Sequence, residues 1–163
     1  MNQRITQCLI LACGNTLRED DGFGPVLAQW AEERWRDDPR VRVLCDHQWT
    51  PEMVEEVAQA ESVVFVDCAT DCAPGVVRTM SIEPAADNSK LGTHHLGASE
   101  LLALSKQLYD AMPRSSLLLT IGAASLELRE GFSQVVEAAL PEAHRLLEDS
   151  VQRLLNSAKD HRA

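Results

Sequence analysis

Short apolar runs alternate along this chain with segments in which apolar residues recur at helical spacing. Continuous apolar runs of this length are typical of strands that are buried on both faces. They predict strands over residues 8–13, 41–45, 62–68 and 116–123, and a weaker alternation predicts a further strand over 76–82.

Four segments between these runs carry the periodicity of amphipathic helices. They span residues 22–36, 51–60, 97–110 and 133–158. Leu101, Leu104 and Leu108 mark one face of the third helix. Pro141 is expected to kink or restart the last helix, because proline lacks the amide proton that a helix interior needs. The stretch 83–94 has little pattern and is expected to be a loop.

The alternation of strands and helices predicts an α/β fold, a three-layer sandwich in which helices flank a mixed, mostly parallel sheet. With 163 residues the chain has the usual length of one domain. We therefore expect residues 1–163 to fold as a single unit, with a frayed tail over about 159–163. In folds of this class ligands bind where the carboxyl ends of the strands lead into loops.

The formal net charge of −10 narrows the classes of partner. Such a field repels the phosphates of nucleic acids and of anionic membranes, and it suits a metal ion or a cationic protein segment. No stretch approaches the length of a membrane span and the N-terminus has no apolar signal region, so we expect a cytoplasmic protein. The acidic charge favours a soluble monomer. The five cysteines lack zinc-ribbon spacing, which indicates a reducing compartment and mostly buried thiols.

The loop "GNTLREDDGFG" (residues 14–24) places Glu19, Asp20 and Asp21 in a row after the first predicted strand. One carboxylate is explained by capping of the helix that begins near residue 22, where it also favours the helix dipole. Capping leaves the other two unexplained, so an added functional role is favoured. The EF-hand and P-loop patterns are both absent from the loop.

Asp67 ends the apolar strand "SVVFVDC", at the same predicted edge of the sheet as Asp21. Taken alone, it is as readily the first solvated residue after a strand as a functional group. Two carboxylates that share a cleft bind a cation or share a proton, so the pairing favours function.

The loop "LGTHHLGA" supplies imidazole groups just before the third predicted helix. His94 and His95 are adjacent and do not easily point into one site, so at most one is a ligand. Two carboxylates and one imidazole leave coordination positions open. Such a set fits an open transition-metal site better than a closed structural zinc site.

The other candidates for chemistry are weaker. Three serines lack the G-x-S-x-G context of a nucleophile elbow: Ser99, Ser115 and Ser116. Cys13 and Cys68 are interpreted as core residues. His47 faces either the site or the solvent, and the sequence does not decide between them.

Taken in order, three of these segments resemble the signatures of the hydrogenase maturation endopeptidases. They are "LILACGNTLREDDGFGPVLA", the strand "VVFVDCA" that ends in Asp67, and the histidine loop "GTHHLGASELLAL". The segment "HQWTPEM" is similar to the branch that serves cytoplasmic bidirectional or NAD-linked nickel–iron hydrogenases.

The resemblance implies an aspartic-type peptide hydrolase that removes the C-terminal extension of a hydrogenase large-subunit precursor after nickel insertion. It assigns Asp21, Asp67 and His94 as the catalytic residues that contact nickel held by the precursor, with Asp20 in support. The nickel comes with the substrate, and no tightly bound cofactor is expected. The segment "IGAASLELREGFS" lacks the proline that this family often has before its last helix.

Two other functions use the same residues. A metal-dependent hydrolase of small molecules needs the same ligands, and it predicts a metal that stays bound through purification. A non-catalytic chaperone or nickel-binding module binds the large subunit without shortening it, which a mass measurement distinguishes.

Overall fold

A five-stranded sheet with the strand order β2-β1-β3-β5-β4 forms the centre of the molecule. The structure is a computed structural model, and it describes residues 6–86 and 96–161. The strands are β1 (Thr6–Cys13), β2 (Val41–Asp46), β3 (Ala60–Ala69), β4 (Val77–Ser81) and β5 (Ser115–Gly122). All neighbours pair in parallel except β4, which pairs antiparallel with β5 at one edge. The predicted mixed, mostly parallel sheet is confirmed.

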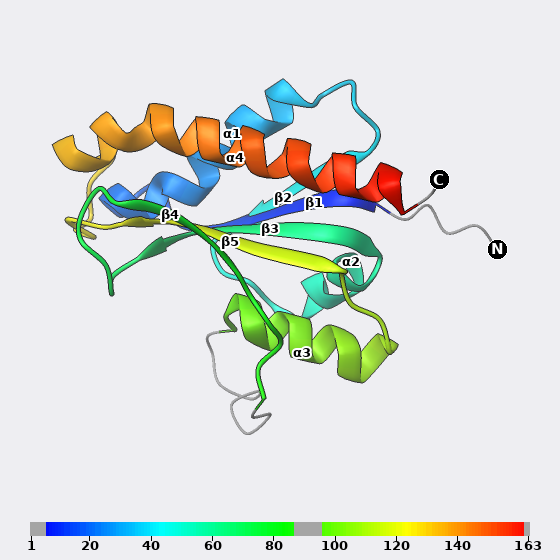
Figure 1. Cartoon of the computed structure of the whole chain (residues 1–163). Helices are drawn as coiled ribbons and strands as arrows, with labels where there is room; N and C mark the ends of the chain where they lie inside the picture. The colour runs from blue at the N-terminus through cyan, green and yellow to red at the C-terminus, as the bar shows by residue number, and fades with distance from the viewer. Residues whose placement is uncertain (1–5, 87–95, 162–163) are drawn as a thin grey trace.

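Helices cover both faces of this sheet. They are α1 (Phe23–Arg34), α2 (Val54–Ala58), α3 (Ala98–Tyr109) and α4 (Gln134–Asp160), with 3-10 turns at Glu19–Gly22 and Pro51–Met53. Helices α1 and α4 pack on one face and α2 and α3 on the other (Figure 1). The predicted three-layer sandwich is therefore confirmed. Within the described part of the chain, no helix has the length and apolar character that crossing a membrane requires.

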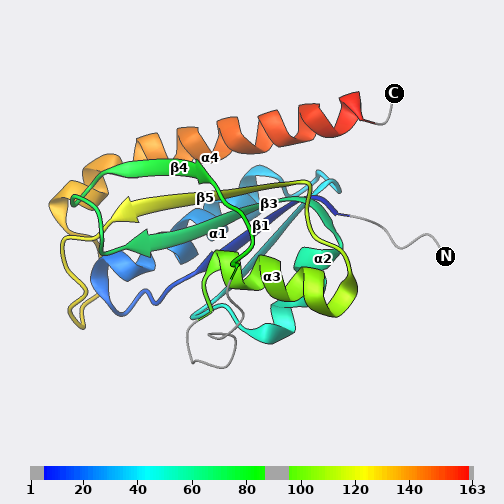
Figure 2. The same cartoon turned by 60° about the horizontal axis from the view of Figure 1, so that its bottom comes forward.

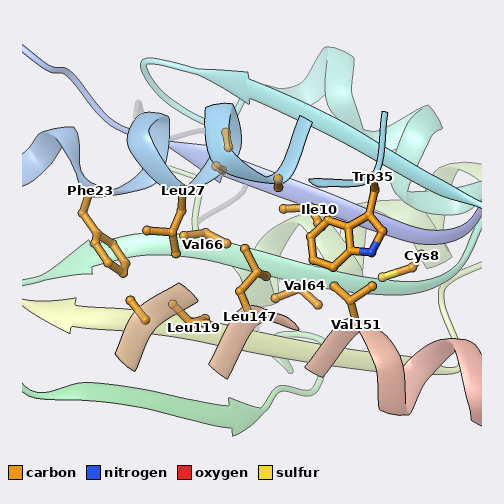
Figure 3. Packing of buried hydrophobic residues seen from close by; sticks show 14 of the residues in the cluster. Cys8, Ile10, Phe23, Leu27, Trp35, Val64, Val66, Leu119, Leu147 and Val151 are labelled. Atoms are coloured by element: carbon orange, nitrogen blue, oxygen red, sulfur yellow. The ribbon is translucent and has the colours of Figure 1, made fainter. Parts of the chain in front are cut away.

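The core lies in two layers because side chains alternate between the faces of each strand. On β1, Ile10 belongs to the cluster beneath α1 and α4, whereas Leu11 belongs to the cluster beneath α2 and α3. Figure 3 shows the first cluster, in which Phe23 of α1 and Leu147 of α4 reach toward Val66 of β3. The apolar runs of the sequence are thus explained by burial on both sides.

Three details of the helices differ from expectation. Helix α2 ends at Ala58, because Ala60 already belongs to β3 and pairs with Thr6. Helix α4 does not restart at Pro141; it continues through that residue, and its regularly spaced buried side chains hold it on the sheet. Leu108 does not mark the buried face of α3, since it is 61% exposed.

The path of the chain changes direction at one end of the sheet. From β1 the chain crosses through α1 to β2 on one side, and from β2 it returns through α2 to β3 on the other side. The connections after β1 and β3, two adjacent strands, therefore leave their carboxyl ends toward opposite edges of the sheet, one to β2 and the other to β4. This divergence is the switch point at which open α/β sheets bind ligands.

Candidate active site

Two carboxylates meet at this switch point. Asp21 lies in the 3-10 turn that follows β1, and Asp67 lies near the carboxyl end of β3. The charge of Asp21 helps to raise the pKa of Asp67, so the two groups are electrostatic neighbours. The structure therefore brings these two acids together at one end of the sheet, where the sequence predicts that they pair.

Glycines allow the turn after β1 to fold tightly against the strand. A Cβ atom on Gly24 would lie 2.1 Å from the carbonyl oxygen of Cys13, and one on Gly14 would lie 2.0 Å from that of Asp21. The amide of Asn15 donates to Asp21 twice, to Oδ2 at 2.9 Å and to the main-chain oxygen at 3.1 Å. These contacts hold the Asp21 carboxylate in place just after the carboxyl end of β1.

Asp67 is half-buried, and it holds its proton more tightly than an ordinary aspartic acid does. Burial raises its pKa to about 6, and the charge of Asp21 adds to the rise. The amide of Cys68 donates to Asp67 Oδ1 at 2.7 Å and the thiol of Cys13 is a second donor, and both contacts oppose the rise. At neutral pH Asp67 is mostly ionised, at a position where ionisation is unfavourable.

Two further polar groups flank Asp67 on the same face of the sheet. The β1–β3 register extends by one step to bring Cys13 opposite Asp67, and Thr120 of β5 is its partner on the other side. Cys13 is 7% exposed and Thr120 5% exposed. The Thr120 hydroxyl has no hydrogen-bond partner among the described residues. The sequence alone does not indicate that these three side chains lie in one row, because the row depends on the register between the strands.

The acids before Asp21 serve the structure and are not helix caps. No side chain caps the turn or α1. Asp20 is fully buried, and it accepts hydrogen bonds from the amides of Ala124, Ser125 and Ser133 and from the Ser133 hydroxyl. Burial alone would raise the pKa of Asp20, and these hydrogen bonds outweigh burial and lower it.

Glu19 completes this attachment of the acidic loop to the β5–α4 connection. It is buried and pairs with Arg129, whose Nε donates to Glu19 Oε1 at 2.8 Å. Hydrogen bonds from Ser125 and Arg129 hold the pKa of Glu19 below its usual value. Glu19 and Asp20 therefore position the loop, and Asp21 is the acid that remains to pair with Asp67.

The thiols are less buried than predicted. All five cysteines are free, but only Cys8 and Cys13 are buried, and Cys45 is exposed. Cys68 is half-buried and lies outside both apolar clusters, so its interpretation as a core residue is wrong. Burial raises the pKa of Cys68 to about 12, and the charges of Asp21 and Asp67 contribute.

The imidazole candidates are placed only in part. His94 and His95 lie outside the described residues, so their predicted role stays a prediction. His47 is exposed just beyond β2. Ser115 begins β5, at the end of the sheet opposite Asp67. Among the described residues, no group of three or more His, Cys, Asp or Glu side chains is arranged to hold a metal ion.

The chain is similar to proteins of hydrogenase maturation. The hydrogenase expression/formation protein HupM of Azotobacter chroococcum mcd 1 is 32% identical over 141 residues, which cover 81% of this chain and 67% of HupM. The hydrogenase 2 maturation protease of Escherichia coli K12 is 25% identical over 139 residues, which cover 83% of this chain and 84% of that protein. This chain belongs to the hydrogenase maturation endopeptidase family.

The fold of this maturation endopeptidase agrees with that of a solved relative. The maturating endopeptidase HybD of E. coli matches with a TM-score of 0.74 over 90% of this chain and 92% of HybD, at 22% identity. No protein-family model matches the chain. The names of the relatives state no electron acceptor or location, so the branch within the family stays a prediction.

Proposed function

We propose that this endopeptidase removes the C-terminal extension of a nickel–iron hydrogenase large-subunit precursor after nickel has been inserted. In this proposal Asp21, Asp67 and His94 contact the nickel ion while the thiolates of the precursor still hold it. The observation that carries the proposal is the pairing of Asp21 and Asp67 at the switch point of the sheet.

The electrostatics of the pair favour a cation that arrives with the substrate. Burial and the neighbouring charge of Asp21 both disfavour ionised Asp67 in the free protein. A divalent ion placed between the two carboxylates reverses both effects, since a nearby positive charge stabilises each ionised group. Only a precursor that carries its nickel gains this binding free energy. The enzyme can therefore distinguish nickel-loaded from nickel-free precursor.

The donor set also suits nickel chemically. Carboxylate oxygen and imidazole nitrogen are both accepted by this ion, and the thiolates of the precursor provide the stronger ligands. We further propose that the nickel comes with the substrate and that the protein has no tightly bound cofactor of its own.

The metal would then promote hydrolysis in two ways, by orienting the precursor and by polarising a reacting group. Contact with Asp21, Asp67 and His94 would orient the precursor so that the scissile peptide lies beside the ion. The ion can polarise the peptide carbonyl or a bound water molecule. Water adds to the carbonyl carbon, the carbon–nitrogen bond breaks, and a proton passes to the departing amine.

The test is the mass of the nickel-loaded precursor after incubation with the enzyme. Wild type should shorten it by the mass of the extension, and Asp21→Asn or Asp67→Asn should leave it intact. Asp71→Asn is the matched control, because Asp71 lies just beyond β3 with an 84% exposed side chain. Full activity of either site variant would contradict the proposed role of that carboxylate.

The histidine assignment has a control in the neighbouring residue. We expect His94→Ala to abolish shortening and His95→Ala to retain it. The reverse result would move the assignment by one position. A precursor that binds wild type and is never shortened would instead favour the chaperone, and a metal that co-purifies with the free enzyme would favour the small-molecule hydrolase.

A cytoplasmic location and a monomeric state complete the proposal. Both rest on the acidic net charge and the composition of the chain. Sedimentation of the purified protein tests the second.

A further inference from the structure

Among the described residues, the most exposed large apolar side chain belongs to the connection that the acidic loop is bonded to. Leu128 of the β5–α4 connection is 86% exposed, and Leu17 of the acidic loop is 56% exposed. Their segments run in parallel and are joined by a single isolated bridge between Arg18 and Arg129. Leu17 and Leu128 lie one register step before that bridge, and residues paired across parallel strands share a face. They form one apolar feature, which we call the leucine pair.

Main-chain hydrogen bonds hold the two segments together. The Arg129 amide donates to the Leu17 carbonyl oxygen at 2.9 Å, and the Glu19 amide donates to the Arg129 carbonyl oxygen at 2.8 Å. Both views of the fold place this connection at the arrowhead end of the sheet, next to the beginning of α1 (Figures 1 and 2). The leucine pair therefore lies at the end of the sheet that also carries Asp21.

Buried side chains anchor the same segments. Asp20 and Glu19, both buried, bond to the β5–α4 connection from inside. Glu19 also adopts a left-handed backbone conformation, with φ of 45°, which a residue with a side chain rarely takes. These bonds hold the main chain of both segments in place, while the side chains of Leu17 and Leu128 stay exposed to water.

We propose that the leucine pair is the docking surface for the folded body of the large-subunit precursor. This inference rests on the proposed function. A folded precursor that presents its nickel to the enzyme must also bring the protein surface around the nickel into contact with the enzyme. Leu17 lies four residues before Asp21 in the same loop, and the leucine pair lies at the end of the sheet that carries Asp21, so it is the exposed apolar surface that we expect the body of the precursor to cover. Apolar side chains on a fixed main chain lose less entropy when they are covered than those on a mobile loop, which suits them to anchor an interface.

The experiment measures precursor binding and cleavage by Leu17→Ser/Leu128→Ser. Leu108→Ser is the matched control, since Leu108 is 61% exposed at the carboxyl end of α3, away from the site. For the double variant we expect KM and the Kd of the nickel-loaded precursor to rise about 5- to 30-fold, as at interface hot spots, with kcat within about twofold. The control should stay within about twofold in all three constants.

The outcomes separate this inference from the proposed function. Unchanged KM and Kd in the double variant overturn the docking surface, even if wild type cleaves the precursor normally. A wild type that binds without cleaving contradicts the proposed function alone, because the Kd comparison still tests the docking surface. If wild type is a dimer in sedimentation and the double variant a monomer, the leucine pair joins copies of this chain and the inference is wrong.

Discussion

The thiol of Cys13 and the carboxylate of Asp67 are hydrogen-bonded neighbours across β1 and β3. Both side chains face α2 and α3, where the carboxyl ends of the two strands meet. Asp67 is thereby held in a partly desolvated place at which its negative charge lowers the stability of the fold. Acids in such positions are characteristic of functional sites, where stability is lost in exchange for chemistry.

Asp67→Asn should therefore stabilise the protein above pH 6. The folded-state pKa of Asp67, about 6, exceeds the ordinary value of 3.8, so the folded form of wild type becomes less favourable as pH rises between these values. We expect the variant to gain at most about 3 kcal/mol at pH 8. The gain should vanish below pH 4, where wild type is protonated in both states. Urea unfolding at several pH values measures the difference, and a variant less stable at pH 8 would contradict the account.

The adjacent acids Asp20 and Asp21 should give opposite phenotypes. Asp20→Asn places an amide donor against the N–H groups that Asp20 accepts, so we expect a loss of about 2–4 kcal/mol in the free energy of unfolding. Asp21→Asn should lose less than about 1 kcal/mol because Asp21 is only half-buried. Precursor cleavage should be lost in Asp21→Asn at temperatures where the variant remains folded. Equal destabilisation by both substitutions would refute this division of roles.

Gly24 should tolerate no side chain. Its Cβ position lies 2.1 Å from the Cys13 carbonyl oxygen, so Gly24→Ala must displace α1 or β1 and should cost at least about 3 kcal/mol. Gly131→Ala is the control, because Gly131 has φ of +91° and no neighbour within 4 Å of its Cβ position. Backbone strain alone should cost the control about 1–2 kcal/mol. The prediction is wrong if thermal denaturation ranks the two in the other order.

Thr120→Val should be neutral or stabilise the protein by up to about 1 kcal/mol. The Thr120 hydroxyl is buried without a partner among the described residues, and valine has the same shape. Ser62→Ala provides the comparison, since the buried Ser62 hydroxyl donates to the Gln7 carbonyl oxygen at 2.6 Å. Removing that bond should cost about 1 kcal/mol. A comparable loss in Thr120→Val would reveal a partner for its hydroxyl.

The strands and the paired carboxylates could be predicted because each depends on local pattern. Apolar runs locate β1 and β3, and the end of a parallel strand fixes where a following acid lies. Asp67 and Asp21 were found in this way. The structural role of Asp20 could not be predicted, because its partners lie more than a hundred positions away, in the β5–α4 connection.

The surroundings of individual side chains could not be predicted from the sequence. Cys13 was correctly interpreted as a buried residue, but its contact with Asp67 depends on the register between β1 and β3. Cys68 alternates in sequence like a core residue, and it lies so near the open end of the sheet that the apolar clusters do not cover it. Leu108 fits the helical period, yet it lies in the last turn of α3 and is exposed.

The dependence of cleavage on nickel tests the central claim most directly. Purified enzyme is incubated with the same large-subunit precursor in its nickel-loaded and its nickel-free form, and the intact mass of the precursor is followed with time. The account predicts that only the nickel-loaded form is shortened, and that it stays intact with Asp67→Asn. Equal cleavage of both forms by the wild-type enzyme would contradict recognition of substrate-held nickel.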